Sequence, residues 1–136
     1  MTLHAAVRIS ITTDVDIVTA RQSGRALATE LGFSLTDTTL IATAISEVAR
    51  NITTYAERGE IVCEPIRGER QGLLVVAVDE GPGIADVELA LQDGFTTGQG
   101  MGLGLPGAKR LMDEFEVESI PGRGTTVTMR KWLPRT

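Results

Sequence analysis

Glu47 and Asn51 stand four positions apart in a segment with the periodicity of a helix. Residues at this spacing lie on one helical face, so the carboxylate and the amide would project together. A carboxylate in this position can accept a proton from a hydroxyl group, and an amide oxygen can bind a hard cation such as Mg²⁺. Taken alone, the pair is more typical of the exposed face of an amphipathic helix, so its interpretation depends on the rest of the chain.

Asp79 follows the apolar run 73–78, which places a carboxylate at the end of a buried strand. A carboxylate there needs a hydrogen-bond donor, and the exocyclic amine of a purine is a suitable one. Gly81 and Gly83 come next, and glycine lets the backbone approach a flat ring without an intervening Cβ. The same segment is equally typical of an ordinary turn.

Glycines alternate with other residues in the segment that leads into a predicted helix. Free N–H groups at a helix N-terminus attract phosphate oxygens, and glycines keep side chains out of the way. The segment is not a Walker A loop, since no Gly-Lys-Ser/Thr follows, and its spacing is not that of a dinucleotide-binding fingerprint. A flexible polar loop is the alternative. The predicted phosphate-binding residues are Gly98, Gly100, Met101, Gly102, Leu103, Gly104 and Leu105.

Thr125 follows the glycine-containing turn 122–124. Its hydroxyl can hydrogen-bond to the same purine or to a water molecule that the purine orders, although the turn by itself is compatible with a simple hairpin. The four segments occur in one order along the chain. Together, a carboxylate, an amide, a strand-end aspartate and backbone-exposing loops predict a site for a nucleotide and its metal ion.

Composition narrows the class of protein. With 136 residues and 42% hydrophobic content, we expect one domain covering 1–136. A net charge of -5 with scattered basic residues argues against a nucleic-acid partner. No stretch approaches the ~20 apolar residues that cross a bilayer, so we expect no membrane association. Cys63 is the only cysteine, which favours a reducing, cytoplasmic compartment.

Hydrophobic periodicity predicts an α+β, two-layer sandwich: a mostly antiparallel mixed sheet with helices on one face. The first helix would be capped by Asp14 or Asp16, and the second by Thr36 or Thr38 with Tyr55 at the end of its apolar stripe. The segment 80–104 reads as a lid over a ligand. The expected strands are 6–12, 60–66, 73–79, 117–120 and 125–132, and the expected helices end at 31, 55 and 115, the last beginning at 105.

In this order the four segments resemble the N, G1, G2 and G3 boxes of the Bergerat-fold (GHKL) ATPases, the superfamily that includes gyrase and the histidine kinases. The resemblance implies the Bergerat ATP-binding fold, with ATP and Mg²⁺ as cofactors. It implies that Glu47 is the general base, that Asn51 is the Mg²⁺ ligand and that Asp79 binds adenine. Gly81 and Gly83 match the first glycine box, and residues 100–105 match the phosphate loop.

Within the superfamily, the chain resembles the anti-sigma regulatory serine/threonine kinases, most closely the stressosome switch kinases. A histidine kinase needs a phosphoacceptor histidine on a pair of dimerisation helices, but the only histidine, His4, precedes the first predicted strand. A gyrase-like protein needs a transducer domain, for which the chain is too short. We therefore expect neither a histidine kinase nor a gyrase-like protein. Segments 93–97 and 107–115, with 131–133 near the end, carry the closer resemblance. It implies phosphorylation of a serine or threonine on STAS-domain scaffold or antagonist proteins, followed by binding and activation of a PP2C-type phosphatase.

Two other functions remain open from the sequence. One is an anti-sigma factor that binds a sigma factor and also phosphorylates its STAS-domain antagonist. The other is a nucleotide-gated binding module without catalysis. The identity of the bound partner separates the first from a stressosome kinase, and phosphate transfer separates both kinases from the binding module.

The predicted phosphate segment has no basic residue, since none occurs between Arg70 and Lys109. The related anti-sigma kinases carry an arginine at the position aligned with Gly98, where it can meet the γ-phosphate. We therefore expect ATP to bind with a dissociation constant in the micromolar range or weaker. Isothermal titration calorimetry measures this constant, and a nanomolar value would contradict the prediction.

Overall fold

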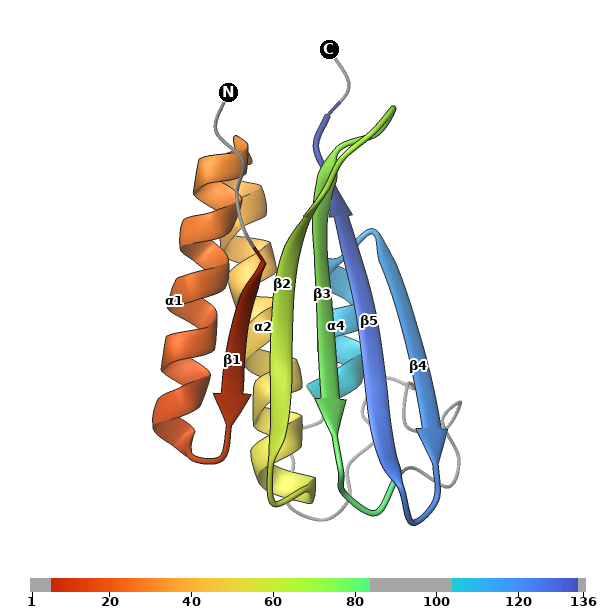
Figure 1. Cartoon of the computed structure of the whole chain (residues 1–136). Coiled ribbons are helices and arrows are strands. Elements are labelled where there is room, and N and C mark those ends of the chain that lie inside the picture. The colour runs from red at the N-terminus through yellow and green to blue at the C-terminus, as the bar shows by residue number, and fades with distance from the viewer. Residues whose placement is uncertain (1–5, 84–103, 135–136) are drawn as a thin grey trace.

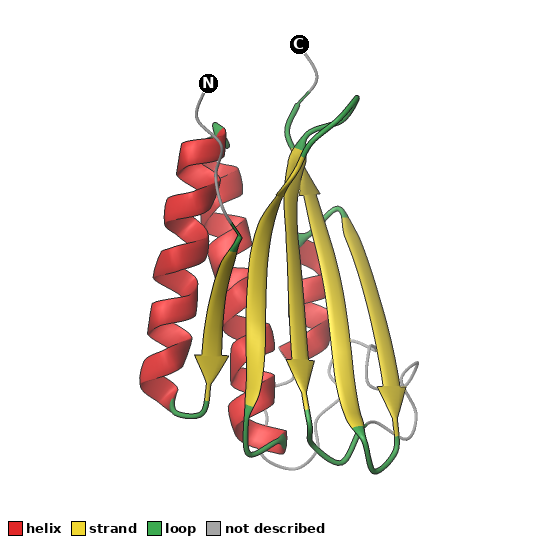
Figure 2. Cartoon of the chain, in the orientation of Figure 1, coloured by secondary structure: helices red, strands yellow, loops and turns green. Residues whose placement is uncertain are grey.

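The computed structural model describes residues 6–83 and 104–134. They form two layers, a five-stranded sheet and three helices packed on one of its faces (Figures 1 and 2), which confirms the predicted α+β architecture. None of the described helices combines the length and apolarity needed to cross a membrane. The elements are β1 (Val7–Ile11), α1 (Asp14–Leu31), α2 (Leu35–Tyr55), β2 (Gly59–Ile66), β3 (Gly72–Asp79), α4 (Gly104–Leu111), β4 (Glu114–Ile120) and β5 (Gly124–Trp132).

The strands lie in the order β1-β2-β3-β5-β4, and all the described pairings are antiparallel. β3 is the central strand, as its continuous apolar run predicted. Its last residue, Asp79, lies opposite Thr125 near the beginning of β5. The register therefore brings two of the predicted site residues together at one end of the sheet, although they are 46 positions apart in the chain.

The core lies between the inner face of the sheet and the helices. The predicted stripe of α2 is fully buried, at Ile41, Ile45, Val48 and Ile52. The prediction that Tyr55 continues this stripe is wrong, because its side chain is 39% exposed. Tyr55 is the last residue of α2, and Ala56, at the C-cap, packs against the core in its place.

Both predicted helix caps are wrong by a few residues. α1 is capped by Thr13, and the Asp16 carboxylate reaches back to accept hydrogen bonds from the N–H groups of Thr12 (2.9 Å) and Thr13 (3.0 Å). α2 is capped by Ser34, whose hydroxyl accepts from the N–H of Asp37 at 3.1 Å. In each case a hydroxyl residue before the helix is followed three positions later by an aspartate, so the helix begins earlier than the first acidic or threonine residue chosen from the pattern.

The third predicted helix is too long, because α4 ends at Leu111 and the next residues enter β4. The Lys131 amine donates to the Leu111 carbonyl at 3.0 Å, and the Asp113 carboxylate accepts from the Trp132 N–H at 2.8 Å. Both contacts come from β5. The strand therefore ends the helix and pairs with Phe115, which the sequence pattern had assigned to the helix.

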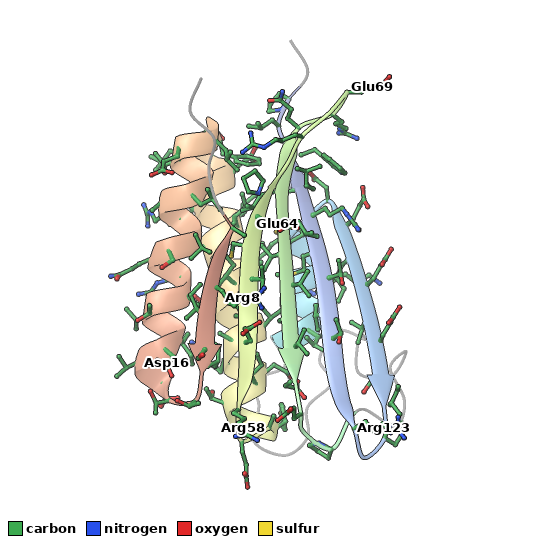
Figure 3. All side chains as sticks on the ribbon, viewed as in Figure 1. Arg8, Asp16, Arg58, Glu64, Glu69 and Arg123 are labelled. Atoms are coloured by element: carbon green, nitrogen blue, oxygen red, sulfur yellow. The ribbon has the colours of Figure 1, made fainter. Side chains whose placement is uncertain are left out.

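The hydrogen bonds from Thr12 and Thr13 hold the pKa of Asp16 below the ordinary aspartate value. A lowered folded-state pKa contributes stability that is present above the unfolded-state pKa and is lost as the pH falls through the folded-state pKa. Asp16 lies at the exposed lower end of α1 (Figure 3). We expect Asp16→Asn to lower the melting temperature at pH 7. The melting temperatures at pH 7 and pH 3 should therefore differ less in the variant than in the unchanged protein.

Circular dichroism melts at the two pH values measure this difference. The matched control is Asp14→Asn, which removes an acidic residue from the same helical turn. An equal loss of pH dependence in the control would contradict the assigned role of Asp16.

Candidate functional site

Four elements contribute the described site residues at one end of the molecule. These are the end of β3, the last turns of α2, the beginning of β5 and the beginning of α4, which lie together at the lower end of Figure 1. The antiparallel connection of β3 to β5 and the packing of α4 against α2 produce this arrangement.

Asp79 is the most constrained residue of the site. Its side chain is 9% exposed, and its Oδ1 accepts hydrogen bonds from the N–H of Gly81 at 2.9 Å and from the N–H of Thr125 at 3.3 Å. Within the described part of the chain, Oδ2 accepts no hydrogen bond. One carboxylate oxygen therefore holds the two strands together, and the other is left for a donor such as an exocyclic amine.

The loop after β3 passes through two places that admit only glycine. A Cβ on Gly81 would lie 2.7 Å from the Cβ of Ala56 at the end of α2. Gly83 has a φ of +79°, and a Cβ there would lie 2.6 Å from the carbonyl oxygen of Ile120. The loop is also joined to the β4–β5 turn by a hydrogen bond from the Gly122 N–H to the Pro82 carbonyl at 2.8 Å. The backbone at this end of the sheet is consequently packed closely against its neighbours.

Thr125 is 5% exposed and belongs to a hydroxyl pair that sequence reasoning missed. The Ser119 hydroxyl donates to the Gly124 carbonyl at 3.2 Å, and its oxygen lies 2.9 Å from Thr125 Oγ1. Either hydroxyl can be the donor in the second contact, and in both cases the Thr125 oxygen keeps capacity to accept a hydrogen bond. The signal was available in the hairpin register, which pairs Ser119 with Thr125.

Glu47 and Asn51 lie on the same face of α2, between the core and solvent. The Glu47 side chain is 13% exposed, and Asn51 is half-buried. The Arg50 guanidinium donates to Glu47 Oε1 at 3.1 Å while remaining 57% exposed. Sequence reasoning missed this ion pair, although Glu and Arg at i and i+3 on a helix are a recognisable pair.

The predicted phosphate-binding segment is described only where it enters α4. Gly104 begins the helix, and Leu105 is 4% exposed in the core. Ala108, one turn further, is fully buried. The rest of the prediction lies outside the described residues, at Gly98, Gly100, Met101, Gly102 and Leu103.

The family model for the histidine kinase-like ATPase domain matches residues 11–131. The chain belongs to this family. The match extends from the end of β1 to β5 and includes every described site residue. The family is one of ATP-binding domains, in agreement with the resemblance seen in the four sequence segments.

Curated relatives refine this family. The chain is 52% identical over 127 residues to the serine/threonine-protein kinase RsbT of Bacillus subtilis, covering 92% of this chain and 95% of the relative. It is 37% identical over 121 residues to the anti-sigma F factor of Caldanaerobacter subterraneus subsp. tengcongensis, covering 85% of each. The first similarity supports protein serine/threonine kinase activity for this chain.

Solved structures of histidine kinases share the fold. The mycobacterial sensor histidine kinase MprB superposes with a TM-score of 0.59 at 19% identity, covering 94% of this chain and 97% of that chain. The histidine kinase domain of a blue-light activated kinase from Erythrobacter litoralis gives a TM-score of 0.56 at 15% identity. At these identities the likeness concerns the backbone arrangement alone.

The close contact of Gly81 with Ala56 predicts the effect of adding a methyl group. We expect Gly81→Ala to lower the free energy of unfolding by about 1–3 kcal/mol, because the loop or the end of α2 must shift. Urea denaturation measures the change. The double variant Gly81→Ala with Ala56→Gly should recover part of the loss, and an additive further loss would contradict this explanation.

Proposed function

We propose that the chain is an ATP-dependent serine/threonine kinase of a bacterial partner-switching pathway. In this proposal it transfers the γ-phosphoryl group of ATP to a serine or threonine of STAS-domain scaffold proteins, and then binds and activates a PP2C-type phosphatase. The observation that carries the nucleotide part is Asp79, a buried carboxylate with one oxygen held by two backbone N–H groups and the other unpartnered in the described chain.

Adenine binding follows from the shape and polarity at the end of β3. Asp79 Oδ2 would accept a hydrogen bond from the exocyclic amine, and the Thr125 oxygen would accept one from the ring's ordered water. The closely packed turn at Gly81 and Gly83 would support the flat ring from the side. Because Oδ1 is already held, the carboxylate is oriented before the nucleotide arrives, which reduces the ordering cost of binding.

Phosphoryl transfer is assigned to the half-buried face of α2. The acceptor hydroxyl oxygen forms a bond to the γ-phosphorus while the bond from that phosphorus to the β–γ bridging oxygen breaks, and ADP leaves with the electron pair. Glu47 takes the hydroxyl proton. Arg50 holds Oε1 of this carboxylate, which leaves Oε2 to receive the proton.

A divalent cation fits the amide of Asn51. The Asn51 side chain is half-buried and makes no hydrogen bond within the described residues, so its oxygen can serve as a ligand for Mg²⁺. When bound, the cation would supply charge neutralisation to the phosphates. The backbone N–H groups of residues 98–105, the segment that precedes and enters α4 in the sequence, would share that role.

The partners are proposed from relatives. The 52% identity to the serine/threonine-protein kinase RsbT supports the kinase part. The STAS-domain substrate, the phosphatase and the stressosome role in the cytoplasm are those that the resemblance to the stressosome switch kinases implies. The anti-sigma F factors favour a second candidate, a kinase that also binds a sigma factor. Co-purification distinguishes the two candidates, because a sigma factor in the complex would contradict the stressosome kinase proposal.

Glu47→Gln should remove the base while preserving size and hydrogen bonding. We expect phosphorylation of a STAS-domain protein to fall by at least about a hundredfold, with ATP affinity changed little. Single-turnover transfer from radiolabelled ATP measures the rate, and calorimetry measures the affinity. Glu69→Gln, at an exposed glutamate between β2 and β3, is the matched control, and undiminished transfer by Glu47→Gln would defeat the assigned role.

Asp79→Asn should separate the two oxygens of this side chain. The retained Oδ1 can still accept from Gly81 and Thr125, whereas an NH₂ group replaces Oδ2 and meets the adenine amine as a second donor. We expect ATP affinity to fall at least about tenfold, equivalent to about 1.4 kcal/mol. Thermal melts check that the fold is kept. An unchanged affinity for ATP with the fold intact would remove Asp79 from the adenine site.

A further inference from the structure

The central strand is apolar on both faces, but the described helices cover only one of them. A strand that is hydrophobic throughout is typical of a sheet covered on both sides. In Figure 2, α2 and α4 lie behind the sheet and α1 lies at its left edge beside β1, and no described element lies in front of the sheet. The outward side chains of β3 are Leu74, Val76 and Val78, and Val78 is 40% exposed.

Strand register extends this patch across the sheet. Val76 lies between Val62 of β2 and Thr128 of β5, so apolar groups continue sideways from the central strand. The next position outward from Thr128 is Glu116 of the edge strand β4. We call the central part of the outward-facing surface the open face, and its members on β2, β3, β4 and β5 are Glu60, Val62, Glu64, Leu74, Val76, Val78, Glu114, Glu116, Glu118, Thr126, Thr128 and Arg130, with Arg8 on β1. The same register continues toward the strand ends with Ser10, Ile66 and Trp132.

Acidic side chains border the apolar centre on both sides. The open face carries five carboxylates and two guanidinium groups, a net charge of -3. Arg8 is paired with Glu60, and Arg130 with Glu114. The other three, Glu64, Glu116 and Glu118, make no ion pair or hydrogen bond within the part of the chain that the structure describes.

This charge pattern favours one kind of occupant. A second copy of the chain would bring two negative faces together, and like charges across an interface are unfavourable. Acidic residues on an edge strand can simply discourage strand pairing, which would account for β4. Glu64 is different, because β2 is an interior strand with both edges paired, and Figure 3 shows this residue and Arg8 on the open side of the sheet. A cationic partner would pair with the carboxylates on both sides of the apolar centre, at Glu64 on β2 and at the glutamates of β4.

We propose that the open face is a docking surface for a segment of a partner protein that carries an apolar stripe flanked by lysine or arginine. The stripe would cover Val62, Val76 and Val78, and the basic residues would meet Glu64 and Glu116. The proposal does not depend on the proposed function. Glu47 belongs to the helical layer, and Asp79 follows the outward-facing Val78 on β3 and therefore faces the helices, so a partner can dock while a nucleotide is bound.

The test uses a synthetic amphipathic helical peptide of leucine and lysine, titrated into the isotopically labelled full chain and followed by amide NMR. We expect shifts concentrated on β2, β3 and β5. Val76→Thr, which keeps the shape of the strand residue, should weaken binding at least about threefold at any salt concentration. Glu116→Lys should weaken it by a similar factor at low salt and by less at high salt. Glu69→Lys, at the β2–β3 hairpin tip (Figure 3), is the charge-matched control and should change binding less than about twofold.

Three outcomes would overturn the proposal. The first is a set of shifts spread over the helices, and the second is equal weakening by Glu69→Lys and Glu116→Lys. The third is a dimer in sedimentation velocity that Val76→Thr dissociates, because a second copy would then cover the face. The amide spectra report whether each variant is folded. If Val76→Thr is not, Val78→Thr replaces it at the more exposed position.

Discussion

The pairing of β3 with β5 is the constraint on which the rest of the site depends. It places Asp79 beside Thr125, and one carboxylate oxygen of Asp79 then holds both the neighbouring strand and its own following loop. A shift of one residue in this register would turn Thr125 to the opposite face of the sheet. The positions of the glycine turn, the hairpin and the Asp79 oxygen that has no partner in the described chain therefore all depend on a single strand pairing.

The helical layer is positioned by contacts from the same strand. Lys131 of β5 binds the carbonyl of Leu111, and Asp113 binds the backbone of β5, so the end of α4 is attached to the sheet. The beginning of α4 then packs against α2, which carries Glu47 and Asn51. The described residues of the proposed adenine and metal positions thus belong to elements that are packed together, and no described element covers the opposite face of the sheet.

Much of the fold was predictable because buried residues recur along the chain at the short repeats of strands and helices. The alternation in β1, the stripe of α2 and the apolar run of β3 all correspond to observed elements. The errors occur where a distant partner overrides the local pattern: Phe115 continues a helical period, yet it pairs in β4. Ser34 and Thr13 were missed as caps because several polar residues compete at each helix start, and only the hydrogen bonds distinguish them.

The sequence by itself determined the residue types of the site, their order and the family resemblance, because glycine spacing and a strand-end carboxylate are local properties of the chain. Only the tertiary structure decided which atoms remain available. It gives Oδ1 of Asp79 two hydrogen-bond donors and Oδ2 none among the described residues. It also joins Arg50 to Glu47 and places Ser119 beside Thr125. It also places every described helix on one side of β3, so that no described element covers the other face of this apolar strand. These outcomes depend on register and layer packing, which join residues far apart in the chain and have no local signature.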